Sequence, residues 1–251
     1  MDKEFALKYD ELEQNHWWFK ARRNILKKLL NHFVDWQDIE NAVEIGTSSG
    51  NNLYNIYPTG IPLYGVEPFT ENVKIARQKG DIPVFEGKAE SLPPPLNEKY
   101  FDLITMFDVL EHTADDMAVL NYLHGKLHSG GQLVLSVPAY MWMWGQQDMV
   151  SHHYRRYTQK ELSRKLKKSN FNITYSSYFN TILFPPIAAV RLLSKLTGNQ
   201  QVSNTDKFGD FAYSPGIANA LLFALFNTER KLLPYVSLPF GVSIIIVASK
   251  N

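Results

Sequence analysis

Val43-Glu44-Ile45-Gly46-Thr47-Ser48-Ser49-Gly50 is the most informative segment of the sequence. It joins a short apolar run to a turn of small residues. Gly46 and Gly50 let the backbone turn sharply and approach a ligand closely, because neither has a Cβ atom. We expect a helix from Asn51 or Asn52, whose first N–H groups face the ligand. A strand, a glycine turn and a helix in this order predict a binding site for a nucleotide-like ligand.

The bulk composition fits one large α/β domain. The chain has 251 residues, of which 45% are hydrophobic, enough for a substantial core. The net charge of +1 gives no bulk field that attracts nucleic acid. Without cysteine there is no disulfide, thiolate–zinc site or cysteine nucleophile. The first ten residues resemble no signal peptide, and no apolar run reaches the ~20 residues that span a bilayer. We therefore expect a cytoplasmic protein.

The N-terminal residues 1–36 predict two helices, because apolar residues recur at helical spacing over residues 4–34. Between the helices lies His16-Trp17-Trp18-Phe19-Lys20-Ala21-Arg22-Arg23. Two interpretations remain open. The aromatic side chains pack the helices onto a sheet, or the segment is a lid whose Arg22 or Arg23 meets a carboxylate.

Strands and helices alternate after the glycine turn, which predicts a parallel sheet covered by helices on both faces. We expect strands at 61–66, 82–85, 101–107 and 132–137, helices at 70–79 and 115–127, and a turn at Gly130-Gly131. Ligands bind beyond the carboxyl ends of such strands. Acids lie at these ends, with Glu44 inside the glycine stretch and Glu67 and Asp108 following two other strands.

The acid inside the glycine stretch discriminates between ligands. Glu44 would repel the pyrophosphate of a dinucleotide, and the three-residue gap between Gly46 and Gly50 also fails the dinucleotide fingerprint. A Gly-Lys-Ser/Thr phosphate loop is absent from the sequence. Glu67 at the end of its strand can accept hydrogen bonds from both hydroxyls of a ribose. These residues favour an adenosine ligand that carries positive charge.

The C-terminal half is expected to add a helix and two strands to the core, together with a helical insertion. Thr158 and Glu161 form a capping box that predicts a helix to Lys168, and strands follow at 171–175 and 242–247. We read one domain over 1–251, with N-terminal helices (1–36), a core (40–178 and 241–249) and a helical cap (179–240). The cap is expected to contain an amphipathic segment (187–196), a polar loop (Thr197 to Asp210) and a helix (218–233).

Four segments in order resemble one family. Residues 44–50 resemble the acid-x-Gly-x-Gly-x-Gly motif of class I S-adenosylmethionine-dependent methyltransferases, with Ser48 at the middle glycine. Glu67, residues 87–93 and residues 101–112 are similar to the family's later motifs. The flanks resemble a bacterial subgroup linked to cell-surface glycan or lipid pathways. The resemblance implies a Rossmann-like, mostly parallel seven-stranded sheet and S-adenosyl-L-methionine as cofactor. Together with the predicted lid, it gives the expected cofactor-binding residues: Glu44, Gly46, Thr47, Ser48, Gly50, Glu67, Pro68, Ala89, Glu90, Asp108, Val109 and Arg22.

Residues 138–157 are expected to carry the acceptor chemistry. Methyl transfer is an in-line displacement that mainly needs positioning, and a hydroxyl acceptor gains from a base. His153 is the candidate base, with Asp148 to orient it and Tyr157 beside them. The residues expected to bind the substrate are His112, Arg155 and Arg156. The alternative is that this cluster only ties the irregular segment to the sheet by hydrogen bonds.

Asp108, Glu111 and His112 would lie one turn apart if a helix begins there. Some O-methylating members of the family hold a divalent metal with a similar Glu/Glu/His set. The Asp-Val-Leu-Glu-His pattern also occurs in many metal-free members, so no metal is assigned.

The predicted function is methyl transfer to a small-molecule, glycan or lipid-linked acceptor, with oxygen as the expected methylated atom. The alternatives are a catalytically silent S-adenosylmethionine-binding or scaffold protein and an NAD-linked oxidoreductase, which Glu44 disfavours. Nucleic acid is not expected as a substrate, because no basic–aromatic patch stands out. The two apolar faces of residues 179–240 are expected to be buried, to shape an acceptor pocket, or to contact a membrane peripherally. The sequence leaves the oligomeric state open.

Overall fold

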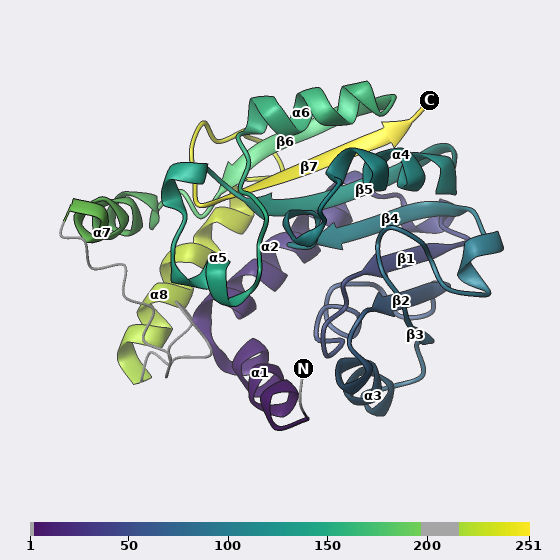
Figure 1. Cartoon of the computed structure of the whole chain (residues 1–251), viewed down its shortest axis with the longest axis horizontal. Helices are drawn as coiled ribbons and strands as arrows, with labels where there is room; N and C mark the ends of the chain where they lie inside the picture. Colours follow the sequence, from purple (N-terminus) through teal and green to yellow (C-terminus); the bar gives the residue numbers. More distant parts are fainter. Residues whose placement is uncertain (1–2, 197–215) are drawn as a thin grey trace.

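The computed structural model describes residues 3–196 and 216–251, and its centre is one seven-stranded sheet (Figure 1). The strand order is β3-β2-β1-β4-β5-β7-β6. The first five strands in this order are parallel, while β7 is antiparallel to both β5 and β6. The strands are β1 (Ala42–Ile45), β2 (Leu63–Glu67), β3 (Val84–Glu86), β4 (Phe101–Phe107), β5 (Leu127–Pro138), β6 (Phe171–Phe179) and β7 (Ser243–Lys250). The predicted Rossmann-like, mostly parallel sheet is confirmed.

Helices cover both faces of the sheet. The α-helices are α1 (Lys3–Asn15), α2 (Trp17–Phe33), α3 (Thr70–Gln78), α4 (Asp116–Lys126), α5 (Gln146–Val150), α6 (Gln159–Lys168), α7 (Phe184–Leu196) and α8 (Gly216–Thr228). Short 3₁₀ turns are η1 (Trp36–Asp38), η2 (Leu96–Glu98), η3 (Leu110–His112), η4 (Met141–Met143) and η6 (Glu229–Lys231). The capping box predicted for α6 is present in part, since the Thr158 side chain accepts a hydrogen bond from the Glu161 N–H.

The core consists of two clusters, one on each face of the sheet. Alternate residues of a strand point to opposite faces, so Ile244 and Ile246 of β7 join one cluster and Ile245 and Val247 join the other. The first cluster contains the apolar side of α4 and α6, and the second that of α2, α3 and α8. This arrangement leaves the carboxyl ends of the parallel strands for the site.

One local prediction was wrong, and another was met in an unexpected way. The helix expected from Asn51 or Asn52 is replaced by a run of hydrogen-bonded turns over residues 51–56. Asparagine side chains compete with the backbone for hydrogen bonds, and the Asn55 amide indeed donates to the Asn51 carbonyl (2.7 Å). The turn expected at Gly130-Gly131 falls within the bounds of β5, yet Gly130 has a φ of +80° and the pairing with β4 passes from Leu127 to Gln132, so the chain does leave the regular strand there.

The N-terminal helices pack on α8 of the cap. Trp17 contacts Phe226 edge to face (ring centroids 6.1 Å apart), and its N–H donates to the Asn219 side chain (2.8 Å). Buried Glu229 accepts the N–H groups of residues 180–182 at 2.7–2.9 Å, which fixes the end of the cap to the junction of β6 and α7. These contacts give Trp17 an aromatic packing role, but its partners here are in α8, whereas the predicted partner was the sheet.

The cap exposes apolar side chains on its helices. Ala188 is the buried residue of α7 and Phe226 that of α8, while Leu196 and Ile217 are more than four-fifths exposed. Among the described residues, none of the helices has the length and apolar character needed to cross a membrane. The polar loop expected at Thr197 to Asp210 lies outside the described residues.

Candidate active site

The glycine turn follows β1 and lies against the end of β2. The Gly46 N–H donates to the Val66 carbonyl (2.7 Å), as does the Thr47 N–H (3.2 Å). Gly46 has a φ of +78°, and a Cβ there would lie 2.2 Å from Cγ2 of Val109. Ser48 also has a positive φ, 49°. The turn therefore needs a left-handed conformation at the position where the family motif has its middle glycine.

Glu67 holds this turn from the end of β2. Its Oε2 accepts the Ser48 N–H (2.9 Å), and its Oε1 accepts from the Asn72 amide (3.0 Å) and the Phe69 N–H (3.3 Å). Burial raises the pKa of Glu67 to about 7, although these hydrogen bonds oppose the shift. The carboxylate thus links the two segments at which an adenosine ligand is expected.

Glu44 is fully buried, and neither of its carboxylate oxygens has a hydrogen-bond partner of good geometry among the described residues. Burial raises its pKa to about 7, partly offset by the nearby Tyr57 and Asn52 side chains. A buried carboxylate without a partner is unfavourable when charged. A positively charged ligand relieves that penalty, so the acids present fit S-adenosylmethionine, which carries a sulfonium and an ammonium.

Arg22 of the predicted lid does meet a carboxylate, and the carboxylate belongs to Asp108. Their side chains form an ion pair of 2.6 Å in which Arg22 is almost fully buried. The Arg22 guanidinium also lies over the rings of Trp18 (5.2 Å) and Phe107 (5.8 Å). Arg23 instead donates to the Glu13 carbonyl (2.7 Å). The pair joins α2 to the end of β4 at the edge of the site.

Helix α1 packs on the glycine turn through the side chains of Asp10 and Glu13, and we call this part of α1 the roof of the turn. The sequence analysis missed this contact. Asp10 accepts hydrogen bonds from the Ser49 hydroxyl (2.6 Å) and the Asn51 amide (2.9 Å). Glu13 bonds the same two side chains at 2.8 Å. Lys79 forms an ion pair with Asp10 and donates to Asn51 (2.8 Å). The signal in the sequence was the pair of acids one helical turn apart.

Tyr9 is a second residue of α1 that the sequence analysis missed. Burial raises the pKa of its phenol, and Glu13, Arg22, Asp108 and Glu67 all act on it electrostatically. Its ring packs edge to face on Phe19 of α2, with ring centroids 5.9 Å apart. A tyrosine in an amphipathic N-terminal helix gives no sequence signal for such a position.

The remaining residues expected at the cofactor lie on loops after the strands. Pro68 directly follows β2, and Ala89 and Glu90 follow β3, so all three are at the carboxyl ends of strands. Ala89 is buried in the core cluster, whereas Pro68 and Glu90 are exposed. Gly50, at a φ of +84°, packs against Ala76 of α3.

Asp148 and His153 form the predicted dyad. The His153 Nδ1 lies 2.8 Å from the Asp148 Oδ1, which also accepts from the Arg156 Nε (2.7 Å). The Gly145 N–H donates to the other Asp148 oxygen (2.8 Å). Burial alone would raise the pKa of Asp148, but the bonds from His153, Arg156 and Gly145 lower it to about 2. The carboxylate is therefore charged and orients the imidazole.

Tyr157 and Arg155 contact a different acid, Asp116 of α4. The fully buried Tyr157 hydroxyl donates to Asp116 (3.0 Å), and burial raises the pKa of this phenol. Arg155 forms an ion pair with the same carboxylate (3.0 Å), as does Lys165 (2.9 Å). For these two residues the contacts match the alternative in which the segment is tied to its neighbours by hydrogen bonds.

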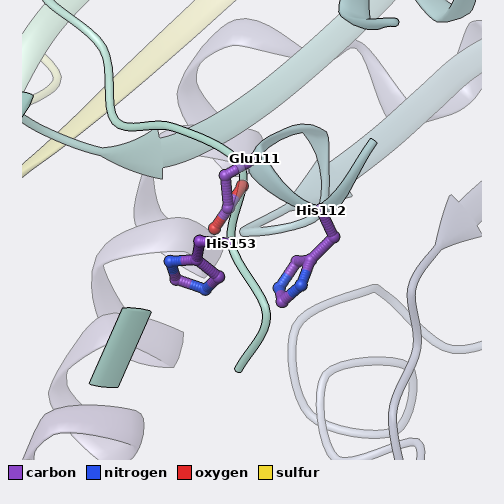
Figure 2. A group of neighbouring side chains, drawn as sticks. All are labelled: Glu111, His112 and His153. Atoms are coloured by element: carbon purple, nitrogen blue, oxygen red, sulfur yellow. The ribbon is translucent and has the colours of Figure 1, made fainter. Parts of the chain in front are cut away.

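Glu111 and His112 lie on η3, and His153 approaches them from the segment after α5 (Figure 2). The His112 and His153 rings are perpendicular, with centroids 4.5 Å apart. The Tyr154 N–H donates to the Glu111 carbonyl (2.8 Å) and holds the two segments together. Burial, and then His153, lower the pKa of His112 to about 4. The expected helical turn from Asp108 is absent here, because Asp108 lies outside η3 with a φ of 56°.

The comparisons with known proteins agree with this geometry. The profile of a methyltransferase domain family matches residues 16–176, well over half of the chain. The chain belongs to the class I methyltransferases. It is an S-adenosylmethionine-dependent methyltransferase, as the motifs predicted, and the proposal of an NAD-linked oxidoreductase is dropped. A search among curated proteins finds no significant match.

Solved structures share the fold at low identity. One is a chain of the complex between the Haloferax volcanii Trm112 methyltransferase activator and a methyltransferase. It has 16% identity and a TM-score of 0.62, and the match covers 99% of the present chain and 97% of the Haloferax chain. Another is a methyltransferase from Thermotoga maritima described as a possible histamine N-methyltransferase, with 17% identity, a TM-score of 0.59 and the same coverages. The [4+2]-cyclase SpnF has 18% identity and a TM-score of 0.60, with coverages of 93% and 82%. The last shows that this fold also serves other reactions.

Proposed function

We propose that this methyltransferase methylates a hydroxyl oxygen of a small-molecule, glycan or lipid-linked acceptor. The observation that carries the proposal is the His153–Asp148 dyad, whose 2.8 Å contact occupies Nδ1 and leaves Nε2 for a substrate proton. Amine and carboxylate acceptors need little help from a base, whereas a hydroxyl does. A buried, charge-assisted dyad is therefore best explained by an oxygen acceptor.

Bound S-adenosylmethionine supplies an activated methyl group. Glu67 is proposed to accept from the ribose hydroxyls, and Glu44 to favour the positive charge of the cofactor. The Arg22–Asp108 pair and Val109 border the same turn and are proposed to contact the methionine part. Proposed further contacts come from the turn and the loops after β2 and β3: Gly46, Thr47, Ser48, Gly50, Pro68, Ala89 and Glu90. Tyr9 is added on the basis of its surroundings.

On the acceptor side, His153 is proposed to take the hydroxyl proton at Nε2 as the carbon–oxygen bond forms. Asp148 holds the ring in the tautomer that leaves Nε2 unprotonated, and Arg156 holds Asp148. His112 adjoins His153 and is proposed to contact the acceptor, together with the partly exposed Arg155. Tyr157 is proposed to act through Asp116 as a positioning residue.

The acceptor class is proposed from the cap. Val190, Leu193 and Leu196 of α7 and Ile217 and Leu221 of α8 are all more than half exposed. Exposed apolar side chains on these two helices suit an acyl or polyprenyl chain, or the surface of a bilayer that carries one. Co-sedimentation with anionic liposomes tests this part, and no binding at low salt would overturn peripheral membrane contact.

The function itself is tested by methyl transfer over a panel of hydroxyl and amine acceptors. We expect transfer to hydroxyls, turnover slowed by roughly two to four orders of magnitude in His153→Ala, and a smaller loss in Asp148→Asn. His128→Ala, at an exposed position on β5, is the matched control. Full turnover with an unchanged pH profile in His153→Ala, or transfer restricted to amines, would overturn the proposal. Cofactor binding by calorimetry without any transfer would indicate a silent cofactor-binding protein.

A further inference from the structure

Glu111, His112 and His153 bring three metal-binding side chains to one place. Each offers one ligand atom, and these atoms all lie within 4.8 Å of one another. Figure 2 shows the Glu111 carboxylate directed toward the His153 ring, with the His112 ring beside it. Asp108 does not belong to the group, because it pairs with Arg22. The set therefore differs from the one suggested by the sequence order around Asp108.

Glu111 provides an independent sign of a ligand. Its side chain is fully buried, and both carboxylate oxygens lack a hydrogen-bond partner among the described residues. A buried carboxylate is normally paired, hydrogen-bonded or bound to a metal. The backbone carbonyl of Glu111, by contrast, is hydrogen-bonded, since it accepts from the Tyr154 N–H. The unsatisfied atoms of Glu111 are its two carboxylate oxygens, and the carboxylate is directed toward the His153 ring with the His112 ring beside it (Figure 2).

A hydrogen bond behind His153 orients this ring as metal sites require. Metal-binding histidines usually donate their other ring N–H to a carboxylate or a backbone carbonyl. The Asp148 carboxylate takes this place at Nδ1 of His153 (2.8 Å), and Arg156 and the Gly145 N–H hold that carboxylate in turn. His153 therefore keeps Nε2 for a ligand.

We propose that Glu111, His112 and His153 bind one divalent transition-metal ion of the zinc type. Two imidazoles and one carboxylate form a donor set typical of catalytic zinc sites, which keep a fourth position open. Ligand atoms around such an ion lie ~3.3 Å apart, given bonds of about 2.0–2.1 Å in tetrahedral geometry. The ligand atoms of the three residues all lie within 4.8 Å of one another, so binding an ion requires them to move closer together.

The ion would change the role of His153. A bound ion would occupy Nε2 of His153, which would then serve as a ligand in place of the base role proposed above, and the ion would supply Lewis acidity to an oxygen at its open position. The metal-free and metal-bound proteins therefore differ in how an acceptor hydroxyl is activated. The inference concerns the ion alone and holds whichever atom is methylated.

The test uses the full chain, stripped with a chelator and titrated with Co²⁺ and Zn²⁺ without cofactor or acceptor. We expect one equivalent of Co²⁺ to give the visible absorption of a four-coordinate site, and Zn²⁺ to displace it. Glu111→Gln and His112→Gln should weaken binding at least tenfold. Asp148→Asn should weaken it roughly 10–100-fold, because it disturbs the bond that orients His153. Glu86→Gln and His128→Gln, both exposed, are the matched controls and should bind as the unaltered protein does.

Several results would overturn the proposal. These are the absence of binding to the stripped protein, a Co²⁺ spectrum of an octahedral, water-like ion, or an affinity unchanged by Glu111→Gln and His112→Gln. Circular dichroism first establishes that each variant is folded, and His112→Asn replaces His112→Gln if it is not. A protein that transfers methyl groups but binds no ion overturns this inference alone. A protein that binds the ion but transfers no methyl group to a hydroxyl overturns only the proposed function.

Discussion

Replacing Glu44 by Gln tests the electrostatic design of the cofactor site. The Glu44 carboxyl is fully buried without a hydrogen-bond partner among the described residues, and its pKa is raised from 4.5 to about 7. Between these two values the native protein holds a proton that the unfolded chain has lost. The contribution of Glu44 to the free energy of unfolding therefore falls as pH rises through this window, and it does not change with pH above or below the window.

The magnitude follows from the shift. A difference of roughly 2.5 pKa units at 1.36 kcal/mol per unit corresponds to about 3 kcal/mol lost between pH 4.5 and 7. Glu44→Gln removes this part of the pH dependence, while Glu67, with a pKa of about 7, keeps its own. We expect the unliganded variant to lose about 3 kcal/mol less than the unaltered protein over the same window. The absolute stability also includes about 1–3 kcal/mol for a buried amide without a partner.

The assay is urea denaturation at a series of pH values from 4.5 to 8.5. Glu86→Gln, at an exposed position, is the control and should leave the pH dependence unchanged. The same variants are titrated with S-adenosylmethionine and S-adenosylhomocysteine, which lacks the positive sulfonium. Glu44→Gln should lose more affinity for the charged ligand, roughly tenfold or more, because the carboxylate no longer offsets its charge. An unchanged pH slope, or equal losses for both ligands, would refute the reasoning.

Three further predictions concern the frame of the site. Gly46→Ala puts a Cβ 2.2 Å from Val109 at a φ of +78°. The substitution should lower the free energy of unfolding by about 2–4 kcal/mol in urea denaturation. A loss below about 1 kcal/mol would contradict the turn geometry. Glu229→Gln puts an amide NH₂ near backbone donors and should cost about 2–3 kcal/mol in the same measurement, an unchanged midpoint being the contrary result. Lys79→Met removes the ion pair with Asp10. It should speed hydrogen exchange in residues 3–15 and lower the global free energy of unfolding by at most about 1 kcal/mol. Unchanged exchange would show that Lys79 does not fix α1 on the glycine turn.

The sheet could be predicted from the sequence because its signals are local. The apolar runs, the glycines and the acids at the strand ends each depend on a few consecutive residues, and the class I fold follows from their order. The N-cap of α6 was predictable for the same reason, since Thr158 and the Glu161 N–H are three residues apart. The wrong helix after Gly50 shows the limit of such rules, because Asn51 bonds to Asp10 and Glu13 of a distant helix.

The side-chain partners in the site depend on contacts between distant segments. Arg22 and Asp108 are far apart in sequence, and the lid hypothesis could not say whose carboxylate Arg22 meets. Tyr157 follows a histidine and two arginines that suggest a polar cluster, yet the fold buries it against Asp116. Only the folded chain brings His153 beside Glu111 and His112. Pairings of this kind have no periodicity or spacing from which they could be read.

The roof over the glycine turn explains why a cation suits a site that many folds use for phosphate. Phosphate sites use the positive N-terminus of a helix directly after the turn. Here residues 51–56 form only hydrogen-bonded turns, with i→i−4 bonds from the Tyr54 N–H to the Gly50 carbonyl (3.3 Å) and from the Ile56 N–H to the Asn52 carbonyl (2.9 Å). The acids of α1 bond to Ser49 of the turn, Glu44 is buried in β1 directly before it, and Glu67 accepts the Ser48 N–H. These carboxylates favour a positively charged adenosine ligand and disfavour a pyrophosphate. Ser48 keeps the left-handed turn that a glycine would adopt more easily, because its N–H is fixed by Glu67.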